Sequence, residues 1–121
     1  MKGFAGRVGI ESQSAEQGRA VLELEVGDEH LNQAGTVHGG VLATLVDTAM
    51  AMAARTTADE SEVPATSQLS LAYLAPGGPG PMVVRAQVRT RGEHLLVCDA
   101  DVEQDGRTLV HAVASFAVLQ H

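Results

Sequence analysis

Apolar and polar residues alternate along five segments of the chain, the pattern of β-strands with one buried face. In residues 19–26 the even-numbered positions are all apolar, whereas most odd-numbered positions are charged. The predicted strands are residues 19–26, 66–74, 81–90, 95–103 and 108–119. The last two flank Asp105-Gly106, a dipeptide typical of hairpin turns. Short turns of this kind make neighbouring strands antiparallel.

Residues 39–55 follow a different pattern, that of a helix that is apolar on almost every side. Within residues 41–54, eleven of fourteen residues are apolar, and the exceptions are Thr44, Asp47 and Thr48. A helix of this composition is predicted to be buried. Because an unpaired buried carboxylate is strongly unfavourable, Asp47 requires either a bonding partner or a function.

The order of elements, one strand, one helix and four further strands, predicts an α+β fold in which one antiparallel sheet packs on the helix. We expect one domain over residues 1–121, with a polar loop before the helix and an exposed acidic loop after it that reaches Pro64. A sheet of five or six strands around one long helix still leaves an edge and one face open. A second copy that continues the sheet would cover both, so a dimer is expected.

Charge and hydropathy narrow the possible functions. Fifteen acidic and eight basic residues give a net charge of −7, which argues against nonspecific binding to nucleic acid. The first residues lack the apolar core of a secretory signal, and the longest apolar run is too short and too polar to span a bilayer. A soluble protein of the cytoplasm, without a membrane partner, is therefore expected.

Neither the cysteine nor the scattered histidines of the chain are predicted to bind a metal or to react. Cys98 is the only cysteine, lies in an apolar-rich run, and is predicted to be a small buried residue rather than a nucleophile. His30, His94, His111 and His121 are scattered without the spacing of metal ligands. Neither a metal nor another cofactor is expected.

Two motifs relate the chain to a family. The first is the run N-x-x-G-T-x-H-G-G, in which an aspartate lies eight residues after the first glycine of the final pair. The second is the later run T-x-x-L-x-x-x-Y-L-x-P. Together they resemble the hotdog-fold acyl-CoA thioesterases, in the branch that includes the PaaI enzymes of phenylacetate degradation and human thioesterase superfamily member 2. The residues that carry the resemblance are Asn32, Gly35, Thr36, His38, Gly39, Gly40, Asp47, Thr66, Leu69, Tyr73, Leu74 and Pro76.

The resemblance implies a hotdog fold, with an antiparallel sheet wrapped around a central helix, and two subunits that join their sheets into one. It implies that Asp47 is the active-site carboxylate, that the Gly39 N–H binds the oxyanion and that Asn32 is the active-site asparagine. A hydroxyl residue near the site falls on Thr66. The implied reaction is hydrolysis of an acyl-CoA with an aromatic or medium-chain acyl group. The implied assembly is a homodimer, two of which form a homotetramer as a dimer of dimers.

The chemistry of thioester hydrolysis agrees with these positions. Gly39 lies in the first helical turn, where N–H groups have no intrahelical partner and the helix dipole is positive, so its N–H suits an oxyanion. Asp47 can attack the carbonyl carbon or deprotonate a water. The two residues are about 12 Å apart along the helix axis, at about 1.5 Å per residue, and cannot both contact one carbonyl group. We therefore predict that Gly39 of one chain and Asp47 of another form each site.

Other roles are open for several of these residues. Asp47 could be a structural residue held by Thr44 or by a backbone group. His38 could be a general base, although a histidine just before a helix more often orients the loop, and that role is favoured. Gly39 and Gly40 could merely form a tight turn into the helix, but Gly40 is expected to contact substrate.

Arginines on one strand provide a possible phosphate site. Arg85, Arg89 and Arg91 are predicted to share a strand face, and Arg89 and Arg91 are expected to bind the phosphates of CoA. The alternative is that they form cross-strand ion pairs with the acidic face of the next strand. That face comprises Asp99, Asp101 and Glu103.

Two other functions fit the same fold. A noncatalytic acyl-CoA-binding hotdog module would not need Asp47. A hotdog dehydratase or hydratase would place a catalytic histidine with an acid in a motif such as D-x(4)-H, which is not found around the helix.

Overall fold

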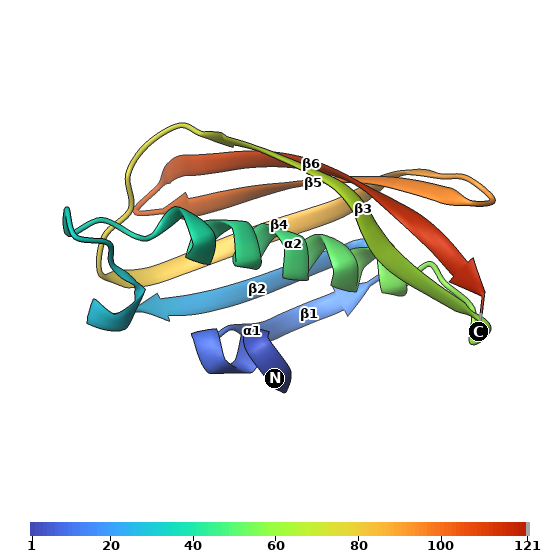
Figure 1. The fold of residues 1–121 in the computed structure, drawn as a ribbon, viewed down its shortest axis with the longest axis horizontal. Coiled ribbons are helices and arrows are strands. Elements are labelled where there is room, and N and C mark those ends of the chain that lie inside the picture. Colours follow the sequence, from blue (N-terminus) through green and yellow to red (C-terminus); the bar gives the residue numbers. More distant parts are fainter. Residues whose placement is uncertain (121) are drawn as a thin grey trace.

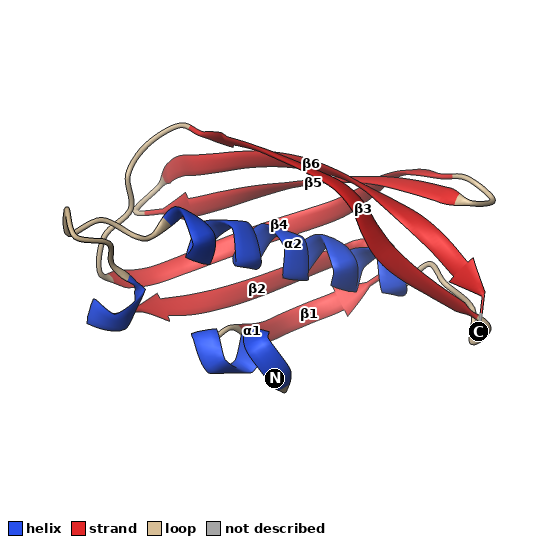
Figure 2. Ribbon diagram, in the orientation of Figure 1, coloured by secondary structure: helices blue, strands red, loops and turns tan. Residues whose placement is uncertain are grey.

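The structure, a computed structural model, describes residues 1–120, so His121 and its predicted lack of a metal role lie outside the described residues. Figure 1 shows the elements in order and Figure 2 their type. They are α1 (Gly3–Val8), β1 (Glu11–Glu16), β2 (Arg19–Val26), the 3-10 turn η1 (Asp28–His30), α2 (Gly39–Arg55), β3 (Glu62–Tyr73), β4 (Gly80–Arg91), β5 (Leu95–Gln104) and β6 (Arg107–Gln120).

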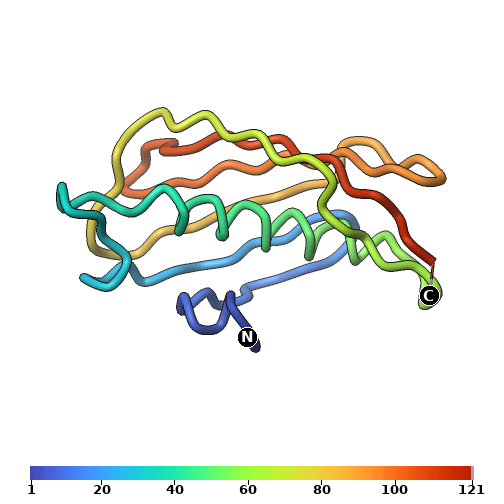
Figure 3. Tube along the Cα trace, viewed as in Figure 1, coloured from blue at the N-terminus to red at the C-terminus, as the bar shows by residue number. Residues whose placement is uncertain are grey.

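All six strands belong to one antiparallel sheet, in the order β1-β2-β4-β5-β6-β3. Helix α2 runs lengthwise across one face of this sheet, as the trace in Figure 3 shows. Strand β3 lies at one edge and is paired only with β6. This arrangement confirms the predicted α+β hotdog fold. None of the helices in residues 1–120 has the length and apolar character needed to cross a membrane.

The predicted helix and the first predicted strand coincide with α2 and β2. Two differences concern segments without a clear apolar pattern. Strand β1 was not predicted because all six of its residues are exposed, so it has no buried face to mark it. The acidic loop after α2 is shorter than expected, since β3 already begins at Glu62 and includes Pro64, which is tolerated because β3 is an edge strand.

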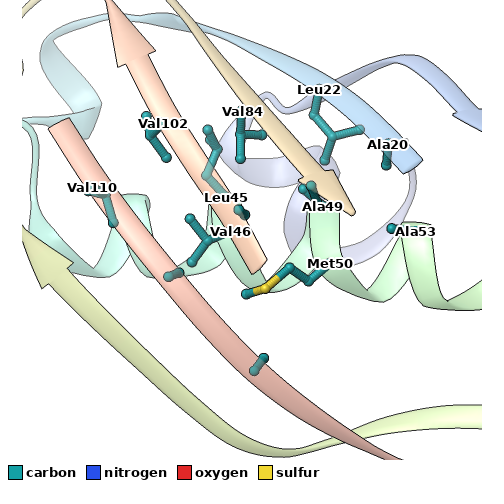
Figure 4. Close-up of a cluster of buried hydrophobic side chains, with 14 of the residues drawn as sticks. Ala20, Leu22, Leu45, Val46, Ala49, Met50, Ala53, Val84, Val102 and Val110 are labelled. Atoms are coloured by element: carbon teal, nitrogen blue, oxygen red, sulfur yellow. The ribbon is translucent and has the colours of Figure 1, made fainter. Parts of the chain in front are cut away.

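The core lies between α2 and the sheet (Figure 4). Alternate residues of β2 point into it, from Ala20 to Val26, as the alternation predicted. The helix contributes its buried face, which comprises Leu42, Leu45, Val46, Ala49, Met50, Ala53 and Ala54. With Val84, Val102 and Val110 from three further strands, these aliphatic side chains form one continuous cluster.

The prediction that α2 is buried on every side is wrong for the single chain. The sheet covers only one side of the helix, and the residues on the other side are exposed or half-buried. They are Gly40, Ala43, Thr44, Asp47, Thr48, Ala51 and Arg55. Asp47 is therefore a half-buried residue on the open side of the helix.

Candidate active site

The loop that leads into α2 is closed by the side chain of Asn32. Its Oδ1 accepts hydrogen bonds from the N–H groups of Ala34 (2.9 Å) and Thr36 (3.1 Å), and the Asn32 N–H donates to the Thr36 carbonyl (2.8 Å). Gly35 adopts a left-handed conformation, with φ of 83°, that allows this tight turn. The structure thus places the predicted active-site asparagine in the exposed loop before the helix, where it fixes the loop's shape.

His38 caps the helix. Its Nδ1 accepts a hydrogen bond from the Gly40 N–H at 2.8 Å, and its carbonyl accepts one from the Val41 N–H at 2.9 Å. Because Nδ1 is an acceptor here, the neutral ring carries its proton on Nε2. Among residues 1–120, no acceptor lies within hydrogen-bonding reach of the Gly39 N–H. Gly39 therefore offers the uncommitted donor that the sequence predicted.

A groove of about 540 Å³ opens beside this donor. Tyr73, the last residue of β3, forms part of its wall and donates a hydrogen bond from its hydroxyl to the Gly39 carbonyl at 2.9 Å. No lining residue carries a charged side chain. The groove is lined by Val37, Gly39, Gly40, Leu42, Tyr73, Leu74, Ala75, Pro76 and Gly77. The chemistry of this surface suits an uncharged, largely apolar ligand.

A residue that the sequence did not indicate holds the loop that follows Gly77, one of the residues lining the groove. Gln104, at the end of β5, is buried and bonds the loop before β4 from both ends of its amide. Its Nε2 donates to the Gly78 carbonyl at 2.8 Å, and its Oε1 accepts from the Gly78 N–H at 2.9 Å. The neighbouring Gly77 carbonyl accepts the Val37 N–H at 3.0 Å. These bonds join the loop to the segment that precedes α2.

Asp47 has a defined partner farther along the helix. The Thr66 hydroxyl, from β3, donates to Asp47 Oδ1 at 2.7 Å. Within residues 1–120, no donor contacts the other carboxylate oxygen. Thr44, considered above as a partner for Asp47, instead donates to the Gly40 carbonyl at 2.8 Å. One oxygen of Asp47 is thus held in place, while the second has no donor among the described residues.

An irregularity in β3 directs both of these contacts toward the helix. Residues an odd number apart on a regular strand point to opposite faces, and Thr66 and Tyr73 are separated by an odd number of positions. The pairing of β3 with β6 shifts register between Thr66 and Gln68, where a β-bulge adds one residue. Both side chains therefore reach α2, Thr66 at Asp47 and Tyr73 at Gly39.

The predicted residues thus form two groups along the open side of α2. The first, at the start of the helix, combines Gly39 with Tyr73. The second, two helical turns later, combines Asp47 with Thr66. One chain does not bring the two groups to a single point, as the helical spacing predicted.

Comparison with known proteins identifies the family of this fold. The sequence profile of the thioesterase superfamily matches residues 34–111, more than half of the chain. The chain belongs to the thioesterase superfamily. It is similar to human acyl-coenzyme A thioesterase 13, with 36% identity over 91 residues that cover 74% of this chain and 64% of the human protein. The chain therefore spans slightly less than two thirds of that relative.

Solved structures of this superfamily share the architecture. The PaaI protein of the E. coli phenylacetic acid degradation operon has a TM-score of 0.88 and 29% identity, covering 95% of this chain and 83% of that chain. A mutant form of PaaI from Thermus thermophilus has a TM-score of 0.89 and 26% identity, covering 96% and 98%. The predicted resemblance is confirmed, and so, at the level of the family, is the predicted class of enzyme, a thioester hydrolase.

The arginines of β4 are not all on one face of this thioesterase-superfamily sheet. Arg85 forms an ion pair with Glu103, and Arg89 Nε lies 2.8 Å from Asp99 Oδ2, both on the side away from α2. A second register shift, between Val88 and Thr90, reverses the alternation. The prediction that Arg91 shares the face of Arg85 and Arg89 is therefore wrong.

Arg91 instead faces the side of the sheet that carries α2. It lies opposite the fully buried Leu96, and its Nη2 is 2.7 Å from Glu62 Oε1 at the start of β3. The two side chains are 29% and 14% exposed, so this pair is better shielded from solvent than the Arg85–Glu103 pair. It joins two strands that are not neighbours in the sheet, across the end of the helix.

Cys98 lies outside both groups of site residues. The prediction of a small buried residue is confirmed, because its side chain is fully buried. Burial, together with the negative charge of Asp99, raises the pKa of the thiol from its ordinary value of 9.0 to about 11. A thiol that stays protonated at neutral pH is a poor nucleophile.

Proposed function

We propose that the protein hydrolyses an acyl-CoA thioester at sites shared between two subunits, with Asp47 as nucleophile or general base and the Gly39 N–H as oxyanion donor. The observation that carries the proposal is the Thr66–Asp47 hydrogen bond on the open side of α2, eight residues from an uncommitted N–H at the start of the helix. A noncatalytic acyl-binding module gives no reason for a positioned carboxylate with one free oxygen.

The reaction needs few groups. Asp47, or a water that it deprotonates, attacks the thioester carbonyl carbon, and the developing oxyanion accepts the Gly39 N–H. The carbon–sulfur bond then breaks and CoA leaves as a thiolate. Since a thiol of this kind has a pKa of about 8.5, the leaving group does not require a strong general acid. Direct attack by Asp47 would give an acyl anhydride that water then cleaves to the free acid.

The free edge of β3 supports a shared site. Thr66 and Tyr73 mark the two groups along this strand, and the midpoint between them lies at Leu69 and Ser70. If two β3 edges pair in antiparallel fashion about that midpoint, Thr66 of one copy comes within about one residue of Tyr73 of the partner subunit. The same pairing brings Asp47 of one copy toward Gly39 of the partner subunit and extends both sheets into one.

The outer face of the sheet supports a further assembly step, from dimers to a homotetramer. On the side away from α2, the strands β5, β6 and β3 each expose at least one large apolar residue, beside the acidic residues of β5. The exposed apolar residues are Leu95, Val113, Leu119 and Val63. An exposed apolar area of this kind is suited to covering by another dimer.

The groove and the arginines outside it suggest where the acyl group and the CoA part of a substrate bind. The uncharged groove beside Gly39 fits an aromatic or medium-chain acyl group, and its size is in the range of small-molecule pockets, about 300–1,000 Å³. Gly40 lines this groove, although His38 already accepts its N–H. Because Arg89 and Arg91 lie on opposite faces of the sheet, they are alternative contacts for the CoA phosphates, and either would share its guanidinium with its acidic partner.

A screen of acyl-CoA esters tests the proposal. Aromatic and straight-chain acyl-CoAs are incubated with the protein, and released CoA is measured with a thiol reagent, using Asp47→Asn as the matched control. Hydrolysis above the level of this variant supports the proposal. Binding of acyl-CoA without release of thiol would contradict it and favour a binding module, and hydration of an enoyl-CoA would favour a hydratase.

A further inference from the structure

We infer that Tyr73 is a positioning residue for the oxyanion donor, acting with His38 to clamp the peptide group between Gly39 and Gly40. The inference rests on the proposed function, because it concerns the geometry of the Gly39 N–H. Tyr73 enters the site from β3, far from the helix in sequence, and its hydroxyl contacts α2 through the Gly39 carbonyl.

The clamp holds both ends of one peptide plane. The carbonyl oxygen of Gly39 accepts the Tyr73 hydroxyl at 2.9 Å, and the N–H of Gly40 donates to His38 Nδ1 at 2.8 Å. A peptide group is planar, so bonds at its oxygen and at its nitrogen fix its orientation. The preceding peptide is held as well, because the His38 carbonyl accepts the Val41 N–H at 2.9 Å.

Two consecutive glycines explain why a clamp is needed. Glycine has more backbone freedom than any other residue, and the first turn of a helix lacks intrahelical bonds to its N–H groups. Gly39 and Gly40 occupy the first two positions of α2, so this turn is intrinsically the least restrained part of the helix. With the peptides on both sides of Gly39 fixed, its φ and ψ are fixed, and its N–H points in one direction.

The contact between Gly39 and Tyr73 also explains the choice of glycine. A Cβ at position 39 would lie 3.3 Å from the Tyr73 hydroxyl oxygen and 3.5 Å from the ring carbon that carries it. The tyrosine therefore packs directly on the glycine backbone. Tyr73 is nevertheless 55% exposed in the single chain, so it contributes little to the core of that chain. The committed hydroxyl indicates a role in the site rather than in this core.

Removing only the hydroxyl isolates this role. Tyr73→Phe keeps the ring and loses the bond to the Gly39 carbonyl. Since a preorganised donor acts mainly on the transition state, we expect kcat to fall about tenfold and KM to change less than about twofold. The control is Thr57→Val, because the Thr57 hydroxyl also donates to a helix carbonyl, that of Ala54 at 2.7 Å, but at the opposite end of α2. It should leave kcat unchanged.

Backbone hydrogen exchange supplies a readout independent of activity. Amide exchange at Gly40, whose N–H is bonded to His38, should accelerate several-fold in Tyr73→Phe and not in Thr57→Val when followed by NMR. A Tyr73→Phe protein with wild-type kcat, or with wild-type exchange at Gly40, overturns the inference. If the wild-type protein hydrolyses no acyl-CoA, the proposed function fails, and the exchange measurement still decides whether Tyr73 holds this turn.

A double variant tests whether Tyr73 and His38 hold the same peptide. If they do, removing the second clamp after the first adds little. The loss of kcat in Tyr73→Phe combined with His38→Ala should then be smaller than the product of the two single losses. A loss equal to that product means that the two residues act independently and contradicts a shared clamp.

Discussion

The Thr66 hydroxyl and the Asp47 carboxylate lie 2.7 Å apart, and this hydrogen bond joins the edge strand β3 to the middle of the central helix. The position of Asp47 therefore depends on the strand at which we propose that two subunits meet. A change in that strand is expected to alter both the assembly and the carboxylate.

Asp47→Asn should lower kcat about 100-fold or more, the scale of a lost general base, while leaving the fold intact. Asparagine keeps the shape and can still accept the Thr66 hydroxyl, but it can neither deprotonate a water nor attack as a carboxylate. Steady-state kinetics and circular dichroism measure the two effects. Activity within a few-fold of wild type would make Asp47 a structural residue.

Two variants of Thr66 test its hydrogen bond to Asp47. Thr66→Ser keeps the hydroxyl and should retain most of the activity. Thr66→Val keeps the shape but leaves the Asp47 carboxylate unrestrained, so we expect kcat to fall about tenfold, the equivalent of about 1.4 kcal/mol. Equal kinetics for the two variants would show that the hydroxyl does not orient Asp47.

Mixed dimers test whether Gly39 and Asp47 act from different chains. Gly39→Pro removes the N–H at the first helical position, where proline is tolerated, and His38 already has the extended conformation required before proline (φ −59°, ψ 133°). Gly39→Pro and Asp47→Asn should each be nearly inactive. Refolded together, they should recover about one quarter of wild-type activity, because about half of the dimers are mixed and each of these has one intact site.

Two controls make the mixed-dimer result decisive. Gly39→Ala adds a Cβ beside Tyr73 but keeps the N–H, so it should be far more active than Gly39→Pro. Native mass spectrometry verifies that mixed dimers form. If they form from folded chains and no activity returns, the two residues do not serve a site shared between subunits.

Variants of His38 separate capping from chemistry. Asparagine is a strong helix cap that accepts the same kind of N–H, so His38→Asn should keep most of the stability and activity. His38→Ala should lower the free energy of unfolding by about 1 kcal/mol and reduce kcat. If His38→Asn is as inactive as His38→Ala, the ring itself contacts the substrate through Nε2.

Arg89→Ala tests the proposed phosphate contact, with Arg85→Ala as a matched control. Both side chains lie on the outer face and each pairs with one carboxylate of β5. Arg89→Ala should raise KM several-fold with little change in kcat, and salt should reduce the difference, because an exposed ion pair is screened. The same KM in both variants would leave cross-strand pairing as the only role of Arg89.

Cys98 should make the protein less stable in alkaline solution. Its pKa is about 11 in the folded protein and 9.0 ordinarily, so the unfolded chain releases the thiol proton first as pH rises. The contribution of the Cys98 thiol to the free energy of unfolding is complete below pH 9.0. Between pH 9.0 and about 11 this free energy falls by about 1.4 kcal/mol per pH unit. Urea unfolding on both sides of pH 9.0 should show a smaller pH dependence in Cys98→Ala; equal dependence would contradict it.

Alternation of apolar residues was enough to predict β2, which packs one face on the core, and an almost continuous apolar run was enough to predict α2. The same criterion could not predict β1, in which no residue is buried. It also assigned Arg91 to the wrong face, since a bulge changes the alternation without leaving a mark in residue type. Local pattern thus predicts elements with one buried face and fails where register changes.

The residues of the candidate site were also only partly predictable from the sequence. The motif indicated Gly39, Asp47 and Thr66, and the helical spacing indicated that Gly39 and Asp47 do not meet within one chain. The bond from Tyr73 to Gly39 was not predicted, although Tyr73 belongs to the same motif, because it joins residues 34 positions apart through a backbone carbonyl. A contact of this kind depends on the tertiary path of β3 and not on the side chain at position 39.

The bulge in β3 determines which of the residues after it face the helix. Deleting Ser67, the extra residue of the bulge, would make the strand regular, and Thr66, Leu69, Leu71 and Tyr73 would all still face the helix. Deleting a second residue between Thr66 and Tyr73 would turn Tyr73 to the opposite face, away from Gly39. The segment between these two residues is therefore expected to tolerate the loss of the bulge residue but not the loss of two residues.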